Sequence, residues 1–159
     1  MEEQKDAANV RFFPPAVPLL TIFIGAGLEW LWPISSVYTP PSPARYYIGG
    51  TIVVGAFLLF GLWSVLLFRR GGQSADPWKP TPHIEERGPF RLTRNPMYLQ
   101  MILICIGFSV AFANWWVLLL TPLAVWALQT LAIKPEEAYL EAKFGETYLA
   151  YRRKVRRWI

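Results

Sequence analysis

The chain alternates between long apolar runs and short polar segments. The apolar runs occupy residues 16–34, 48–68, 96–113 and 115–133. A hydrocarbon core about 30 Å thick is crossed by about 20 helical residues, because each residue of an α-helix rises about 1.5 Å. The pattern therefore predicts an all-α integral membrane fold with about four transmembrane helices. The third run is short, so full crossing by this run is left open.

The third and fourth runs are separated clearly only by Asn114. Two helices joined by so short a connection are expected to be antiparallel neighbours in a transmembrane hairpin. A re-entrant pair that does not fully cross the bilayer is the alternative.

The last segment, residues 135–158, is predicted to be an amphipathic interfacial helix rather than a fifth span. Pro135 suits a first helical turn, and Glu136 and Glu137 suit the positive end of the helix dipole. Apolar residues then recur every three or four positions, at Leu140, Phe144, Tyr148, Tyr151, Val155 and Trp158. This spacing is typical of one apolar helix face, with basic residues on the other.

The amino-acid composition favours a membrane protein. Hydrophobic residues make up 53% of the chain and charged residues 17%, which is too apolar for a soluble domain or a disordered chain. We expect one membrane domain over residues 1–159. The lone Cys105 and lone His83 exclude a disulfide and give no metal site, so we expect no metal.

Basic residues predict the orientation in the membrane. With four spans, both termini and the 69–95 loop share one side, and fifteen of the sixteen Lys and Arg residues lie there; only Arg45 lies outside. Cytosolic loops carry this excess, so both termini are predicted to be cytosolic, in a multi-pass protein of the inner membrane if the source is bacterial. The net charge of +5 is then expected to interact with anionic lipid headgroups, and we expect no nucleic-acid partner.

The junction at residues 86–98 is the first candidate for chemistry. Pro96 fits the first turn of the third helix, which makes Asn95 its N-cap. Free backbone N–H groups there, beside Arg91 and Arg94, would form an anion-binding corner at the membrane surface. A capped helix with snorkelling arginines is the alternative.

The second candidate is the pair Glu136–Glu137, which follows the fourth run. If the third and fourth helices pair, these carboxylates emerge on the same side as the corner at Asn95. An anion-binding corner opposite a carboxylate suits a zwitterionic ligand, such as an amino acid moiety. Electrostatic stabilisation of a helix start is the alternative.

Both segments carry a family resemblance. GPFRLTRNPMYLQ, residues 88–100, resembles the G-x-(Y/F)-x-x-x-R-(H/N)-P-x-Y pattern of the isoprenylcysteine carboxyl methyltransferase family of integral membrane enzymes. Its RNPMY form looks more like that of the bacterial members. EEAYLEAKFGETYLAYRRKV, residues 136–155, is similar to the E-E-x-x-L-x-x-x-F-G-x-x-Y-x-x-Y stretch of that family. The resemblance covers residues 81–158, about half of the chain.

The resemblance implies an S-adenosylmethionine-dependent methyltransferase whose catalytic and cofactor-binding half is residues 69–159. By their positions in the family motifs, the residues expected to bind the cofactor are Pro82, His83, Ile84, Glu85, Phe90, Asn95, Pro96, Met97, Tyr98 and Glu136.

The resemblance leaves the acceptor open. Members that methylate isoprenylcysteine have His where this chain has Asn95, and an arginine where it has Ala132. A lipophilic or small-molecule acceptor at the cytosolic membrane face is therefore expected, and its methylated group, whether carboxylate, thiol or amine, is unassigned. A sterol-reductase-like NADPH oxidoreductase and a non-catalytic membrane subunit are the alternatives.

Overall fold

The computed structural model describes residues 6–10, 12–34 and 42–159, and the regular structure in these ranges is helical. A helix α1 (Ala16–Leu31) and a helix α5 (Pro96–Phe112) stand beside two longer rods. The first rod joins α3 (Ala44–Ala56), the π-helical η1 (Phe57–Leu62) and α4 (Trp63–Arg70). The second joins α6 (Trp115–Leu128), the π-helical η3 (Gln129–Ile133) and α7 (Lys134–Phe144). A short 3-10 helix η2 (Gly88–Arg91) and the helix α8 (Glu146–Lys154) complete the described chain.

The helices form a bundle whose surface is apolar. The two rods, Ala44–Arg70 and Trp115–Phe144, are long and apolar enough to cross a membrane, and α1 and α5 are shorter apolar helices. Large apolar side chains such as Phe23, Tyr47 and Leu119 are exposed on the outside of the bundle. Exposed apolar surface of this extent is typical of a protein that meets lipid. The predicted all-α class is therefore confirmed, and two of the described helices are long and apolar enough to span a membrane.

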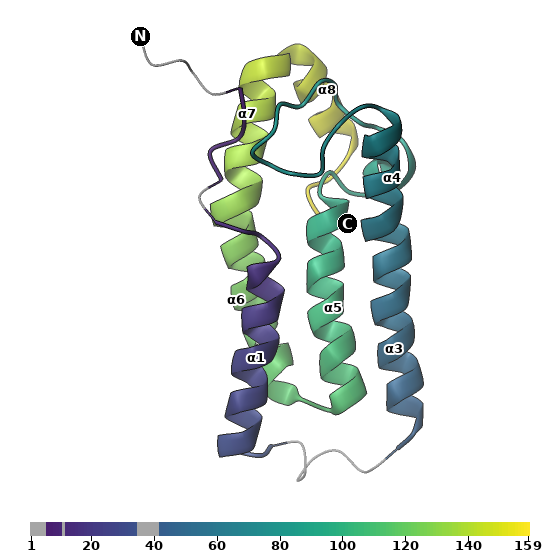
Figure 1. Ribbon diagram of the computed structural model, residues 1–159, viewed down its shortest axis with the longest axis vertical. Coiled ribbons are helices and arrows are strands. Elements are labelled where there is room, and N and C mark those ends of the chain that lie inside the picture. Colours follow the sequence, from purple (N-terminus) through teal and green to yellow (C-terminus); the bar gives the residue numbers. More distant parts are fainter. Residues whose placement is uncertain (1–5, 11, 35–41) are drawn as a thin grey trace.

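Small residues let the helices approach closely. In Figure 1, α5 lies between the α3–α4 rod and the α6–α7 rod, and α1 packs against α6. A Cβ atom added to Gly49 of α3 would lie 2.4 Å from the carbonyl oxygen of Gly107 in α5, and one added to Gly25 of α1 would lie 2.4 Å from Val117. Glycine at these contacts replaces side-chain packing with backbone contact, as in membrane helix pairs.

The predicted hairpin between the third and fourth helices is confirmed. Ala113 has a left-handed backbone conformation at φ 52°, and the Asn114 side chain accepts a hydrogen bond from the Val117 N–H at 3.0 Å, which caps α6. The Asn114 amide also donates to the Gly25 carbonyl oxygen at 3.2 Å. One asparagine thus closes the hairpin and ties α1 to it.

The predicted single helix over residues 135–158 is wrong. The fourth helix does not end at residue 133 but continues through Pro135 to Phe144. A proline lacks only its own backbone donor, and the wider turn of η3 directly before it accommodates the ring. The break comes at Gly145, whose φ of 52° and ψ of −125° end α7 and turn the chain into α8. Residues beyond Lys154 leave the helix and fold back toward α5.

The bounds of the first two helices also differ from the prediction. The first helix ends at Leu31, before residue 34, and the second extends from Ala44 to Arg70.

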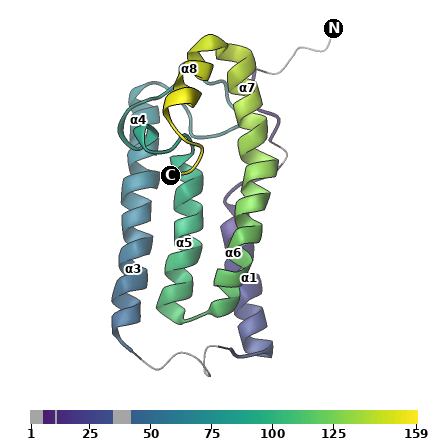
Figure 2. The ribbon, with the colours of Figure 1, turned by 180° about the vertical axis from the view of Figure 1, so that it is seen from behind.

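The polar segment 71–95, α8 and both ends of the described chain lie at one end of the bundle in both views (Figures 1 and 2). Lys5 and Arg11, two of the basic residues used to predict orientation, lie outside the described residues.

Candidate functional site

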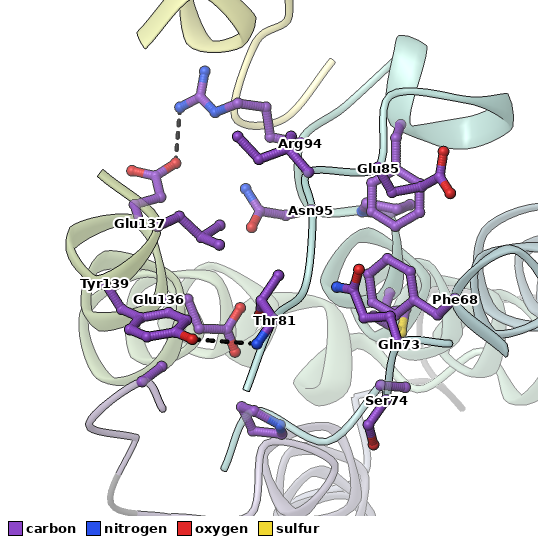
Figure 3. A pocket seen from close by; sticks show the side chains of 18 of the residues that line it. Phe68, Gln73, Ser74, Thr81, Glu85, Arg94, Asn95, Glu136, Glu137 and Tyr139 are labelled. Carbon is purple, nitrogen blue, oxygen red and sulfur yellow. Dashed lines mark hydrogen bonds and ion pairs between the residues drawn. The ribbon is translucent and has the colours of Figure 1, made fainter. Parts of the chain in front are cut away.

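A pocket lies at the polar end of the bundle. Its walls come from the end of α4, the segment 73–85, η2, the first turn of α5, α7 and α8 (Figure 3). Of the ten residues expected to bind a cofactor, nine line this pocket: His83, Ile84, Glu85, Phe90, Asn95, Pro96, Met97, Tyr98 and Glu136. Pro82 is exposed and does not line it.

The first turn of α5 forms the floor of the site. Pro96 is the first residue of the helix, as predicted, and Asn95 occupies the N-cap position. The Asn95 side chain does not cap the helix; its amide nitrogen donates to the Arg157 carbonyl oxygen at 3.0 Å. The N–H groups of Met97 and Tyr98 belong to the first turn, which has no intrahelical acceptors. The helix start therefore presents backbone donors to the pocket.

The two arginines expected beside this corner, Arg91 and Arg94, do not both lie at the pocket. Arg91 is exposed and does not line the pocket. Arg94 does line it, but its guanidinium is bound to the Glu137 carboxylate at 2.8 Å and to the Val155 carbonyl oxygen at 2.6 Å. The Arg94 guanidinium is thus held by groups within the protein.

The two adjacent glutamates of α7 face different surroundings. Figure 3 shows Glu137 directed toward Arg94, and Glu136 directed toward the middle of the pocket. The Tyr98 hydroxyl donates a hydrogen bond to Glu136. Among the described residues, no Lys, Arg or His lies within ion-pairing distance of Glu136. Glu136 therefore offers the pocket a carboxylate that no protein cation neutralises.

Aromatic side chains form the opposite wall. The rings of Phe68 and Phe90 stack with centroids 5.0 Å apart and an interplanar angle of 18°. The Tyr151 hydroxyl donates to the Phe90 carbonyl oxygen at 2.7 Å, which fixes η2 against α8. Burial raises the pKa of Tyr148 to about 12, so its hydroxyl stays protonated at neutral pH. This wall suits a flat or apolar part of a ligand.

The segment 73–85 completes the pocket with polar groups. Glu85 accepts two hydrogen bonds from the Arg87 guanidinium, at 2.8 and 2.7 Å, and these hold the pKa of Glu85 below its usual value. His83 Nε2 lies 3.9 Å from the same carboxylate. Gln73 Oε1 is buried and has no hydrogen-bond partner among the described residues. A buried acceptor without a donor favours a ligand that supplies one.

Several pocket residues were not expected from the sequence. Phe68 is the last apolar residue of the second run, and Gln73 follows it in a segment without a motif. Tyr139 lies one turn along α7 from Glu136, and its hydroxyl accepts a hydrogen bond from the Thr81 N–H at 3.2 Å. Helical spacing from Glu136 could have identified Tyr139; nothing in the local sequence marks Gln73.

Two of the three matches found in comparisons with known proteins are to methyltransferases. A family model described as phospholipid methyltransferase matches residues 44–147. A protein of Haemophilus influenzae described as uncharacterized is 36% identical over 63 residues, which are 40% of this chain and the whole of that protein. The protein-S-isoprenylcysteine O-methyltransferase of Schizosaccharomyces pombe is 34% identical over 68 residues, which are 43% of this chain and 29% of that enzyme. The chain therefore matches less than a third of the yeast enzyme, and no solved structure matches it.

Proposed function

Because the chain belongs to the phospholipid methyltransferase family, we propose that it transfers a methyl group from S-adenosylmethionine to a lipophilic or small acceptor at the cytosolic membrane face. The observation that carries the proposal is the convergence of two distant segments, at Asn95 and at Glu136, on one pocket. The sequence separates them by a complete helical hairpin, and the fold brings both to its polar end.

The chemistry of the pocket fits the cofactor. The methyl donor combines a carboxylate, an ammonium group, a sulfonium, a ribose and an adenine ring. The backbone donors at Met97 and Tyr98 suit the carboxylate, and the carboxylate of Glu136 suits the ammonium group or a hydroxyl. The stacked rings of Phe68 and Phe90 suit the adenine, and the unpartnered Gln73 oxygen suits its exocyclic amine.

The protein contributes mainly position and exclusion of water. When bound, the cofactor supplies an electrophilic methyl group on its sulfonium sulfur. Displacement requires the nucleophile to lie in line with the methyl–sulfur bond, and such positioning contributes about 7–11 kcal/mol to well-oriented reactions. Glu136 and the first turn of α5 hold the amino acid end, and the aromatic wall excludes water on the other side.

The charges of the pocket limit the choice of acceptor and of base. Arg94 is already held by Glu137 and by the Val155 carbonyl oxygen, and Ala132 stands where family members that methylate isoprenylcysteine have an arginine. This arrangement favours an amine or thiol acceptor over a carboxylate. An amine acceptor has to lose a proton, and His83, Glu85 and Glu137 are the three nearby groups considered as the base. Glu85 is engaged by Arg87, and Glu137 by two arginines. We therefore propose His83 as the base.

Topology supports a site at the cytosolic surface. We propose four membrane crossings, by α1, the α3–α4 rod, α5 and the α6–α7 rod, with the pocket at the cytosolic end. The polar segment, α8 and most basic residues lie at this end of the bundle (Figures 1 and 2). A water-soluble cofactor then enters from the cytosol, and a lipophilic acceptor enters from the bilayer.

Calorimetric titration of the purified protein in detergent with S-adenosylhomocysteine tests the cofactor assignment. We expect saturable binding, weakened about tenfold or more by Glu136→Gln, which removes a charged hydrogen-bond acceptor worth about 1.5–3 kcal/mol. Glu141→Gln is the matched control, because Glu141 lies on the same helix in an exposed pair with Arg152. Absence of binding by the unaltered protein would reject the proposal, and equal binding by Glu136→Gln would reject the site.

A further inference from the structure

The end of the described chain lies across the start of α5. The Arg94 N–H donates to the Arg156 carbonyl oxygen at 2.9 Å. The Arg157 carbonyl oxygen accepts from the Thr93 hydroxyl at 2.9 Å and from the Asn95 amide at 3.0 Å. Residues 155–158 are called the C-terminal strap below. Its backbone holds the residues that lead into the pocket-lining turn of α5.

A buried ionic cluster joins the strap to α7. Arg157 binds Glu137 through Nη2 to Oε2 at 2.6 Å and through Nε to Oε1 at 3.1 Å. Arg94 binds the same carboxylate at 2.8 Å, and the side chains of Arg94 and Glu137 are only 8% and 9% exposed. Hydrogen bonding to Glu137 raises the pKa of Arg157, so this guanidinium stays charged across the physiological pH range. One carboxylate therefore links α7, the start of α5 and the strap.

The far end of the strap is anchored elsewhere in the bundle. The Trp158 indole N–H donates to the Gln129 side-chain oxygen at 3.2 Å, and the ring packs against the apolar core. The strap is thus held at η3, at α7 and at α5. None of its residues lines the pocket.

The cluster determines how α7 presents its other glutamate. Consecutive residues of an α-helix point about 100° apart, so fixing Glu137 toward the strap fixes the direction of Glu136. In Figure 3, Glu136 points into the pocket while Glu137 points toward Arg94. Rotation of α7 about its axis would move both carboxylates together.

We propose that Arg157 is a positioning residue of the cofactor site. Through Glu137 it sets the rotation of α7 that directs Glu136 into the pocket, and through its carbonyl oxygen it holds Asn95 beside the helix start. This inference rests on the proposed function, because it concerns binding of the same cofactor. It assigns a role in binding to a side chain that does not touch the pocket.

Paired titration and unfolding measurements test this role. We expect Arg157→Ala to weaken S-adenosylhomocysteine binding about tenfold, because loose support displaces a ligand-binding group. Arg157→Lys should restore part of that loss, since a lysine keeps the charge but not the bidentate geometry. Arg153→Ala is the matched control, because Arg153 forms only an exposed pair with Glu146, and it should bind like the unaltered protein.

The outcomes separate this inference from the proposed function. Failure of the unaltered protein to bind would reject the proposed function. Binding by the unaltered protein and equal binding by Arg157→Ala would overturn only the role of Arg157. A loss of affinity that Arg157→Lys does not reduce, with the same fall in melting temperature for both variants, would also overturn it, because that result indicates general destabilisation.

Hydrogen exchange in the unaltered protein covers the case in which Arg157→Ala does not fold. The Arg94 N–H, bound to the strap, is the reporter. Saturating S-adenosylhomocysteine should slow its exchange about threefold or more, because a ligand that requires the docked strap stabilises it. Unchanged exchange in a protein that binds the ligand would overturn the inference.

Discussion

Among single residues, the neighbouring carboxylates Glu136 and Glu137 have different roles. Glu137 is surrounded by Arg94 and Arg157 and stabilises the fold. Glu136 accepts a hydrogen bond from Tyr98 and otherwise faces the pocket. A cationic ligand gains from Glu136 because no cation among the described residues has to be displaced first. Because Arg94 is held by Glu137, its guanidinium is not free to bind another carboxylate.

Some of the roles of these site residues could be predicted from the sequence. The position of Pro96 identified Asn95 as the N-cap residue, and Glu136 followed from the family motif. The pairing of Arg94 could not be predicted, because its partners Glu137 and Val155 lie 43 and 61 residues away in the chain. The Asn95 side chain, expected to cap α5, donates instead to Arg157.

The depressed pKa of Glu85 predicts a dependence of stability on acid. The hydrogen bonds from Arg87 lower the pKa of Glu85 in the folded protein. The Glu85 carboxylate therefore stabilises the folded state at pH values above its pKa in the unfolded chain, which is about 4.3. That contribution is lost as the pH falls through the lower folded pKa. Melting temperatures of the unaltered protein and Glu85→Gln, measured from pH 7 to pH 3.5, should differ at neutral pH and converge in acid. A constant difference would contradict this assignment.

At the scale of elements, the positions of the helices could be predicted more closely than their ends. Apolar runs placed the third helix within one residue of its observed bounds, Pro96–Phe112. The apolar stripe from Leu140 to Trp158 suggested one helix, but the chain breaks at Gly145 and leaves the helix after Lys154. Stripe spacing continues across a break when both flanking helices pack on the same core, so periodicity alone does not locate it.

The turn at Gly145 is expected to require glycine. Its φ of 52° and ψ of −125° lie where a side chain strains the backbone, although a Cβ atom there would meet no neighbour within 4 Å. Gly145→Ala should therefore destabilise the protein by about 1 to 3 kcal/mol, measured by denaturant unfolding in detergent. Gly50→Ala is the control, because Gly50 is helical and also open; it should be neutral or slightly stabilising. Equal effects of the two changes would contradict a strained turn.

At the scale of the molecule, the fold separates an apolar bundle from a polar end that contains the pocket. The positive-inside pattern predicts that this end is cytosolic. Ser42 is exposed at one end of the α3–α4 rod, and Lys79 is exposed in the polar segment beyond the other end. In a Cys105→Ser background, a membrane-impermeant maleimide should label Ser42→Cys in intact cells and Lys79→Cys only after permeabilisation. The reverse pattern would contradict the orientation.

The central claim is that Glu136 and the start of α5 together hold a methyl donor for transfer. The most direct measurement incubates membranes that contain the protein with methyl-labelled S-adenosylmethionine and then counts label in the lipid, small-molecule and protein fractions. We expect label above that of membranes without the protein in at least one fraction, retained by Glu141→Gln and reduced about tenfold or more by Glu136→Gln. Label no higher than in membranes without the protein, in all three fractions, would contradict it.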